Sequence, residues 1–134
     1  MTARSIRRSA MLRLIYTSKI SRDIDSKGVQ EIISSARNYN KRAAVTGVLL
    51  SNFDCFFQVL EGPDILVKLL FEKIRRDPRH SEVKLVAESQ VGGRLFSQWN
   101  MSYLMVSEKN DSLISSDWTK LSANECETII EMVV

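Results

Sequence analysis

The stretch Phe56-Phe57-Gln58-Val59-Leu60-Glu61-Gly62-Pro63 decides the fold of this chain of 134 residues. It continues an apolar run over 55–60, which is typical of a buried strand, yet the run carries a neutral amide, Gln58, in its middle. Glu61-Gly62-Pro63 then ends the strand, and Pro63 suits the first turn of a helix. A buried amide needs hydrogen-bond partners, so Gln58 is either a core glutamine bonded to backbone or part of a site.

The segments on either side of this stretch predict alternating strands and helices. Strands are expected at 11–18, 45–50, 55–60, 83–88 and 99–106. Helices are expected at 26–40 and 63–76, from their apolar stripes, and in the remainder of the chain after about residue 113. The predicted fold is therefore α+β and ferredoxin-like, βαββαβ with an added fifth strand, two helices on one sheet face and C-terminal helices.

Helix ends are predicted from polar side chains. Asp23, Asp25 and Ser26 are capping candidates before the first helix, which is expected to end in Asn38-Tyr39-Asn40. Asn is common at helix ends for structural reasons alone, so Asn40 has that simpler interpretation too. Ser122 or Asn124 would cap the last helix, which is expected to cover the free face of the sheet or to present a surface to a partner.

Composition restricts the class of protein. With 44% hydrophobic and 26% charged residues and a net charge of +3, the chain is typical of one soluble domain. It has no apolar run of ~20 residues and no apolar secretory segment, which predicts a cytoplasmic protein with no membrane contact. One histidine, His80, and two distant cysteines, Cys55 and Cys126, argue against a metal site or a disulfide. Residues 1–10 are expected to form a flexible basic leader, a solvated tail rather than a nucleic-acid arm.

Uncharged polar side chains are expected to converge on one gap between the helices and the sheet. Tyr16 shares a predicted strand face with Leu12 and Leu14, and Gln58 lies on the third strand. Asn40 borders the same gap at the end of the first helix, and Trp99 and Met101 come from the fifth strand. Such a set suits a flat, neutral, hydrogen-bonding heterocycle better than hydrolysis, which needs a charged base or an activated nucleophile.

Several motifs together resemble the BLUF family, the blue-light sensors that use flavin. They are Leu14-Ile15-Tyr16-Thr17-Ser18, Asn40 followed by Val45-Thr46-Gly47-Val48-Leu49-Leu50, Phe57 to Pro63, Arg76-Asp77-Pro78-Arg79-His80, and Phe96 to Met101. The resemblance covers 11–106, which would be the flavin-binding domain, and leaves 107–134 as a C-terminal helical extension. One departure is Tyr39, where family members often carry Asn or His.

The resemblance implies noncovalent flavin, FAD with FMN as the second choice, held between the two helices. Tyr16 would give an electron and a proton to the photoexcited flavin, and Gln58 would rearrange its hydrogen bonds. Asn40 would hold the O4 and N3–H edge of the ring, and Arg79 and His80 would lie near the opposite carbonyl edge. Trp99 and Met101 would relay the change through the fifth strand to the C-terminal helices.

Two alternatives from other classes remain at this stage. A small phosphate-ester or acyl phosphate hydrolase would need an anion-binding loop, of which Gly92-Gly93-Arg94 is a faint version. A nucleic-acid module would need a stacking platform of aromatic residues, which the strands lack. We therefore expect a stand-alone sensor without enzymatic activity, which signals as a homo-oligomer or through a separate downstream protein.

Overall fold

A computed structural model of the chain describes residues 11–52, 54–96, 101–105 and 116–133. The expected leader at 1–10 and Trp99 lie outside these residues. The elements in chain order are β1 Met11–Ile20, α2 Ser26–Ala43, β2 Thr46–Ser51, β3 Cys55–Pro63, α3 Asp64–Arg75, β4 His80–Gln90, β5 Ser102–Met105, the 3-10 helix η1 Trp118–Lys120, and α4 Ala123–Val133.

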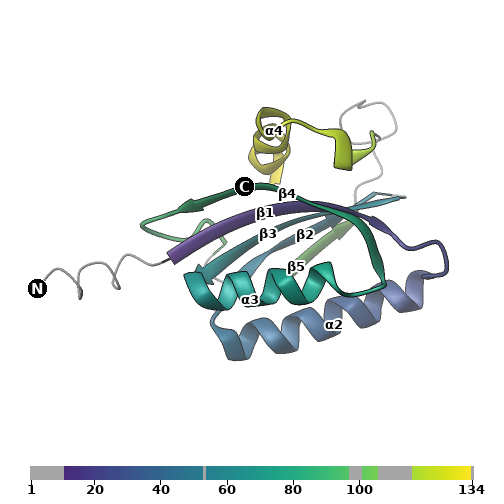
Figure 1. The fold of residues 1–134 in the computed structure, drawn as a ribbon, viewed down its shortest axis with the longest axis horizontal. Helices are drawn as coiled ribbons and strands as arrows, with labels where there is room; N and C mark the ends of the chain where they lie inside the picture. The colour runs from purple at the N-terminus through teal and green to yellow at the C-terminus, as the bar shows by residue number, and fades with distance from the viewer. Residues whose placement is uncertain (1–10, 53, 97–100, 106–115, 134) are drawn as a thin grey trace, which may run out of the picture.

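The five strands form one mixed sheet with the spatial order β4-β1-β3-β2-β5. The β4–β1, β1–β3 and β3–β2 pairs are antiparallel, and β5 joins the edge of the sheet parallel to β2. Helices α2 and α3 lie against one face of the sheet, and α4 lies against the other (Figure 1). This arrangement confirms the predicted ferredoxin-like α+β fold with an added strand.

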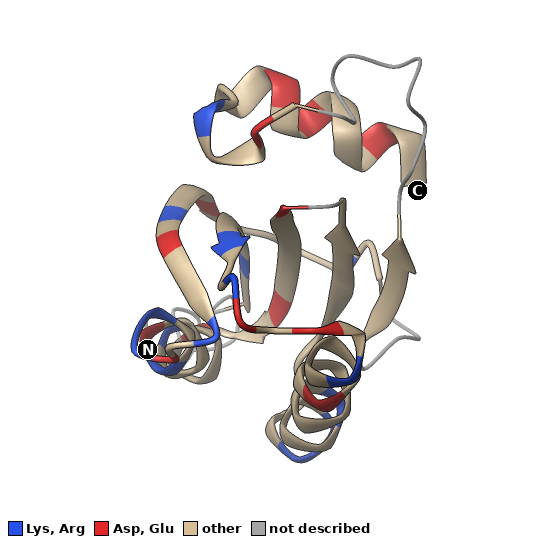
Figure 2. Cartoon of the chain, turned by 90° about the vertical axis from the view of Figure 1, so that its right-hand side faces the viewer, with Lys and Arg blue, Asp and Glu red and all other residues tan. Residues whose placement is uncertain are grey.

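Two apolar layers hold the helices to the sheet. The layer beneath α2 and α3 includes Leu12, Leu14 and Tyr16 of β1, Phe56 and Leu60 of β3, and Met101. The layer beneath α4 includes Phe57, Val59, Trp118, Ile129 and Ile130. Figure 2 shows the sheet between the two helical layers. Strand β2, which lies inside the sheet, carries no charged residue. Of the two uses considered for the C-terminal helix, the structure therefore shows the first, which is to cover the free face of the sheet.

Helix α2 runs beyond the end that its sequence suggested. Asp25 caps the first turn by accepting a hydrogen bond from the Gly28 N–H at 2.8 Å. The helix passes through Asn40 and ends at Ala43, so the predicted end at 38–40 is wrong. The helix ends only where Ala44 adopts a left-handed backbone conformation and donates its N–H to the Asn40 carbonyl. The low intrinsic helix preference of Asn is weak enough for tertiary context to override it.

Strands β3 and β4 are longer than the apolar runs that predicted them. Residues 61–63 were expected to lie beyond the strand, but they pair with 11–13 of β1. Pro63 is thus the last residue of β3 and the N-cap of α3, one position before the helix itself. Similarly, β4 extends over 80–90 because it pairs with β1 along almost all of its length.

The last helix begins with a reciprocal cap. The Glu125 N–H donates to Ser122 Oγ at 3.2 Å, and the Ser122 N–H donates to the Glu125 carboxylate at 2.9 Å. Ser122, rather than Asn124, is therefore the capping residue. In the described part of the chain, no helix has both the length and the apolar character that crossing a membrane requires.

Candidate functional site

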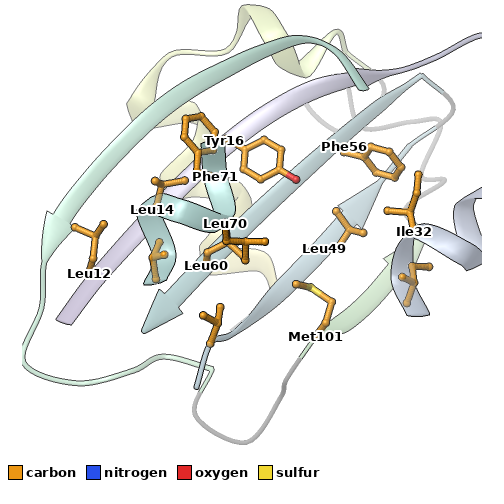
Figure 3. Packing of buried hydrophobic residues seen from close by; sticks show 13 residues of the cluster. Leu12, Leu14, Tyr16, Ile32, Leu49, Phe56, Leu60, Leu70, Phe71 and Met101 are labelled. Carbon is orange, nitrogen blue, oxygen red and sulfur yellow. The ribbon is translucent and has the colours of Figure 1, made fainter. Parts of the chain in front are cut away.

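Tyr16 and Gln58 meet in the core between the sheet and the two helices. The residues face each other across the β1–β3 pair, and the Tyr16 hydroxyl donates a hydrogen bond to Gln58 Oε1. The hydroxyl points toward the side of the core where Leu49 and Met101 lie (Figure 3). Gln58 therefore binds a neighbouring side chain through its amide oxygen.

Met101 accepts a hydrogen bond from the nitrogen of the same Gln58 amide. Gln58 Nε2 donates to the Met101 sulfur at 3.3 Å, and Met101 is buried. Thus one amide joins a phenol on β1 to a thioether just before β5. A thioether is a weak acceptor, so the Gln58–Met101 hydrogen bond is weaker than the Tyr16–Gln58 hydrogen bond.

A pocket between α2, α3 and the sheet contains most of the predicted residues. It is lined by Tyr16, Ile32, Ser35, Ala36, Tyr39, Asn40, Gln58, Leu70, Lys73, Ile74, Asp77, Arg79 and His80. The structure thus brings together five predicted binding residues, from one helix, three strands and the turn after α3. Of the two relay residues, Met101 reaches the network, while Trp99 is not among the described residues.

Burial keeps the Tyr16 phenol neutral. Its side chain is almost wholly inaccessible, and this burial raises its pKa above the ordinary value of 10.0, with a further contribution from the charge of Asp77. The phenol therefore holds its proton over the physiological pH range. The Tyr16 hydroxyl therefore stays protonated and can donate a hydrogen bond in the resting protein.

His80 is held in the pocket wall through one ring nitrogen. His80 Nδ1 lies 3.0 Å from the Ser18 hydroxyl, and the ring packs against Phe56. Burial lowers the pKa of His80 to about 4, an effect that the charge of Arg79 increases and that of Asp77 opposes. The imidazole is therefore neutral near pH 7, with Nε2 as the nitrogen not engaged by Ser18.

Arg79 lines the pocket while bound to a carboxylate that the sequence analysis did not single out. Its guanidinium donates to both carboxylate oxygens of Asp77, the shortest distance being 2.6 Å. This pairing raises the pKa of Arg79. Burial alone would raise the pKa of Asp77, but the hydrogen bonds from Arg79 outweigh it and leave the pKa lowered. Asp77 and Arg79 are only two positions apart in the sequence, and this spacing of opposite charges could have predicted the pair.

Tyr39, the departure from the family pattern, lies beside the pocket and contacts the opposite helix. The Lys73 ammonium lies 5.1 Å from the centroid of the Tyr39 ring, a cation–π contact that joins α3 to α2. The pocket is open to solvent and measures about 90 Å³, which is small beside the roughly 300 Å³ of a compact ligand pocket. A ring of flavin size therefore requires the side chains at the helix interface, such as Lys73 and Tyr39, to move aside.

The donor set matches the chemistry of a flavin ring. Apolar Ile32, Leu70 and Ile74 can contact its faces, while the amides of Asn40 and Gln58 each offer a donor and an acceptor to its edge. Among the described residues, no group of three His, Cys, Asp or Glu could hold a metal ion. The apolar and amide side chains of the pocket fit a flat organic cofactor by their chemistry.

The loop considered for anion binding has a structural task instead. Arg94 donates to Thr46 Oγ1 at 2.9 Å and to the Ala44 carbonyl at 2.8 Å, so its guanidinium fixes the loop to the start of β2. A phosphate-binding role for Gly92-Gly93-Arg94 would require these bonds to be given up. The geometry therefore disfavours the hydrolase alternative.

The chain is similar to known proteins over most of its length. Residues 11–102 match the family model "BLUF: Sensors of blue-light using FAD". The blue light- and temperature-regulated antirepressor BluF of Escherichia coli (strain K12) is 37% identical over 102 residues, which is 75% of this chain but 25% of that protein. The chain thus spans about a quarter of the length of that relative.

Two solved structures extend the likeness to nearly the whole chain. The photo-activated state of BlsA superposes with a TM-score of 0.80 at 25% identity and covers 91% of this chain and 93% of its own. BlrB, described as a BLUF protein in its dark state, has a TM-score of 0.75 at 29% identity and covers 92% of both chains.

Proposed function

Because this chain belongs to the BLUF family of blue-light sensors, we propose that it is a photoreceptor that holds flavin noncovalently between α2 and α3. The observation that carries this proposal is the buried Tyr16–Gln58–Met101 hydrogen-bonded chain in the wall of a pocket of flavin-compatible chemistry. FAD is the flavin named in the family description. As a sensor domain it is not an enzyme.

Five pocket residues are proposed to hold the ring. Tyr16 and Gln58 would face its N5 and O4 edge, and Asn40 would bind O4 and N3–H with the two ends of its amide. His80 and Arg79 would lie near the opposite carbonyl edge. Arg79 is already paired with Asp77, so this carboxylate holds its cationic head in place.

The photochemistry is proposed to begin at the phenol. Flavin, when bound, would supply the absorption of blue light and the acceptor. Tyr16 would give up one electron and one proton to it. Gln58 Oε1 then loses its donor, which makes the amide free to rearrange by rotation, tautomerism or both. Gln58 Nε2 in turn leaves the Met101 sulfur, and the dark arrangement returns when the electron and proton return to Tyr16.

The output is proposed to leave through β5 and the C-terminal helices. Strand β5 is an edge strand, and it exposes Leu104 and Met105 by 44% and 58%. The relative in Escherichia coli is named an antirepressor, so we propose a separate downstream protein, with homo-oligomerisation as part of the response, in the cytoplasm. Size-exclusion chromatography in darkness and under blue light tests the oligomer directly.

The decisive experiment is the visible absorption spectrum of the purified protein in darkness, under blue light and after return to darkness. Flavin bands that shift slightly to the red and recover thermally support the proposal, and extraction of the pigment distinguishes FAD from FMN. Flavin bands that bleach or do not change would leave a flavin pocket without this switch. A protein that remains colourless after incubation with FAD would contradict the proposal.

A further inference from the structure

Met101 is hydrogen bonded at both its side chain and its main chain. Its sulfur accepts from Gln58 Nε2 at 3.3 Å, and its carbonyl oxygen accepts from Arg37 Nε at 3.0 Å. The first bond comes from β3 and the second from α2. Met101 therefore bridges the two elements that form opposite walls of the pocket.

Arg37 lies on the same part of α2 as Asn40. The two residues are three positions apart on the helix, so they are neighbours on its surface, Asn40 lining the pocket and Arg37 reaching Met101. Strand β5 begins at the next residue, Ser102, which pairs with Val48 of β2. The Arg37 bond therefore fixes the main chain immediately before the proposed output strand.

The two bonds on Met101 have different strengths. The bond from the guanidinium to a carbonyl is charge-assisted, whereas the bond from an amide to a thioether is weak. The weak bond alone would leave the start of β5 loosely held even in darkness. Met101 supplies both acceptors, the sulfur on its side chain and the carbonyl on its main chain, so a displacement of this residue would disturb both bonds.

We propose that Arg37 is a positioning residue that holds the start of β5 only while Gln58 binds the Met101 sulfur. The two bonds are made together in darkness and lost together in the light. Arg37 thereby converts rearrangement of one amide into release of the main chain at β5. This inference rests on the proposed function, because it needs a light-driven change at Gln58.

The test is amide hydrogen exchange of residues 102–105 in the flavin-loaded protein, in darkness and under continuous blue light. In Arg37→Gln, dark exchange should rise about tenfold, toward the illuminated rate of the parent, as expected for one lost charge-assisted hydrogen bond. The illuminated rates of parent and variant should coincide. Arg37→Lys, which keeps a cationic donor, should restore part of the dark protection. Arg42→Gln, an exposed change on the same helix, is the matched control and should behave as the parent.

The outcomes separate this inference from the proposed function. A rise of equal size in darkness and in light would make Arg37 an ordinary structural contact and overturn the inference, as would unchanged dark exchange in Arg37→Gln. A parent that binds flavin and shifts its spectrum, but shows no light-dependent exchange at 102–105, also overturns it and leaves the photoreceptor standing. A parent that binds no flavin overturns both.

Discussion

The hydroxyl of Tyr16 donates its hydrogen bond to a residue directly opposite it in the sheet, Gln58, where β1 and β3 run antiparallel. Cross-strand partners of this kind share one face of the sheet, here the face covered by α2 and α3. The donor and the acceptor are therefore positioned by the strand register rather than by a flexible loop. A switch built on this pair starts from one defined geometry.

Replacing Tyr16 by Phe should leave the flavin bound and abolish the reversible red shift. The ring still fills the core, but the electron and proton donor is lost and Gln58 Oε1 lacks its partner, at a cost of about 1–3 kcal/mol in unfolding free energy. Flavin content and the light-minus-dark spectrum measure both effects. A normal photocycle in this variant would refute the role of Tyr16. Tyr103→Phe, on β5, is the control.

Replacing Gln58 by Leu should also retain flavin and remove the red shift, because no amide remains to rearrange. The buried Tyr16 hydroxyl then has no acceptor in Gln58, with a similar loss of stability. Gln90→Leu, at the exposed end of β4, should keep the full light response.

The double variant Tyr16→Phe, Gln58→Leu measures the coupling free energy between the two side chains. Removing both partners leaves neither polar group unpaired, so the double change should destabilise by about 1 kcal/mol less than the two single changes added. Denaturant unfolding of the four proteins measures this coupling. Strict additivity would show that the bond contributes nothing to stability.

Periodicity made the principal site residues predictable. Alternation of period two placed Tyr16 with Leu12 and Leu14, and the structure confirms this face. The polar residue in the middle of an otherwise apolar strand identified Gln58. Periodicity could not show which residue would satisfy that amide, because the register of β1 against β3 depends on pairing between segments about 40 positions apart. Only the family resemblance linked Gln58 to the phenol of Tyr16.

Residues whose roles come only from tertiary contacts were hard to predict from the sequence. Asn40 was predicted, but on a helix end that proved wrong, because the helix continues to Ala43. Arg37, Lys73 and Ser18 look like solvent-facing or neutral positions by type, and their partners lie on other elements. No local pattern encodes such contacts, which arise only when α2, α3 and the sheet have packed.

Gly47 is required by the close approach of β2 to β3. A Cβ at this position would lie 1.9 Å from the carbonyl oxygen of Val59, and backbone cannot yield as a flexible side chain does. Gly47→Ala should therefore lose about 3 kcal/mol or more of unfolding free energy. At Gly92 nothing lies within 4 Å of the same added atom, so Gly92→Ala should change stability by less than about 0.5 kcal/mol. Equal denaturant midpoints would contradict this packing.

Glu61 holds the main chain at Leu95 and Phe96, a few residues before Met101. Its wholly buried carboxylate accepts from Arg13 Nε at 2.8 Å and from the N–H groups of Leu95 and Phe96 at 2.9 Å. Glu61→Gln removes the charge and turns one acceptor into a donor, so it should cost about 3 kcal/mol. Glu72→Gln, which breaks only an exposed pair with Arg75, should cost under about 1 kcal/mol. Comparable losses in thermal unfolding would show that Glu61 is no anchor.

Stability should fall in mild acid because of His80. Its pKa is about 4 in the folded protein against an ordinary 6.5, so between these values the unfolded chain binds a proton that the native state does not. Unfolding free energy therefore rises with pH across this window, and the His80 contribution, up to about 3 kcal/mol, is lost as pH falls from about 6.5 to 4. Subtracting the profile of His80→Asn from that of the parent removes the contribution of carboxylates. A difference that does not change between pH 7 and 4 would mean that His80 titrates normally and is not enclosed between Ser18 and Phe56.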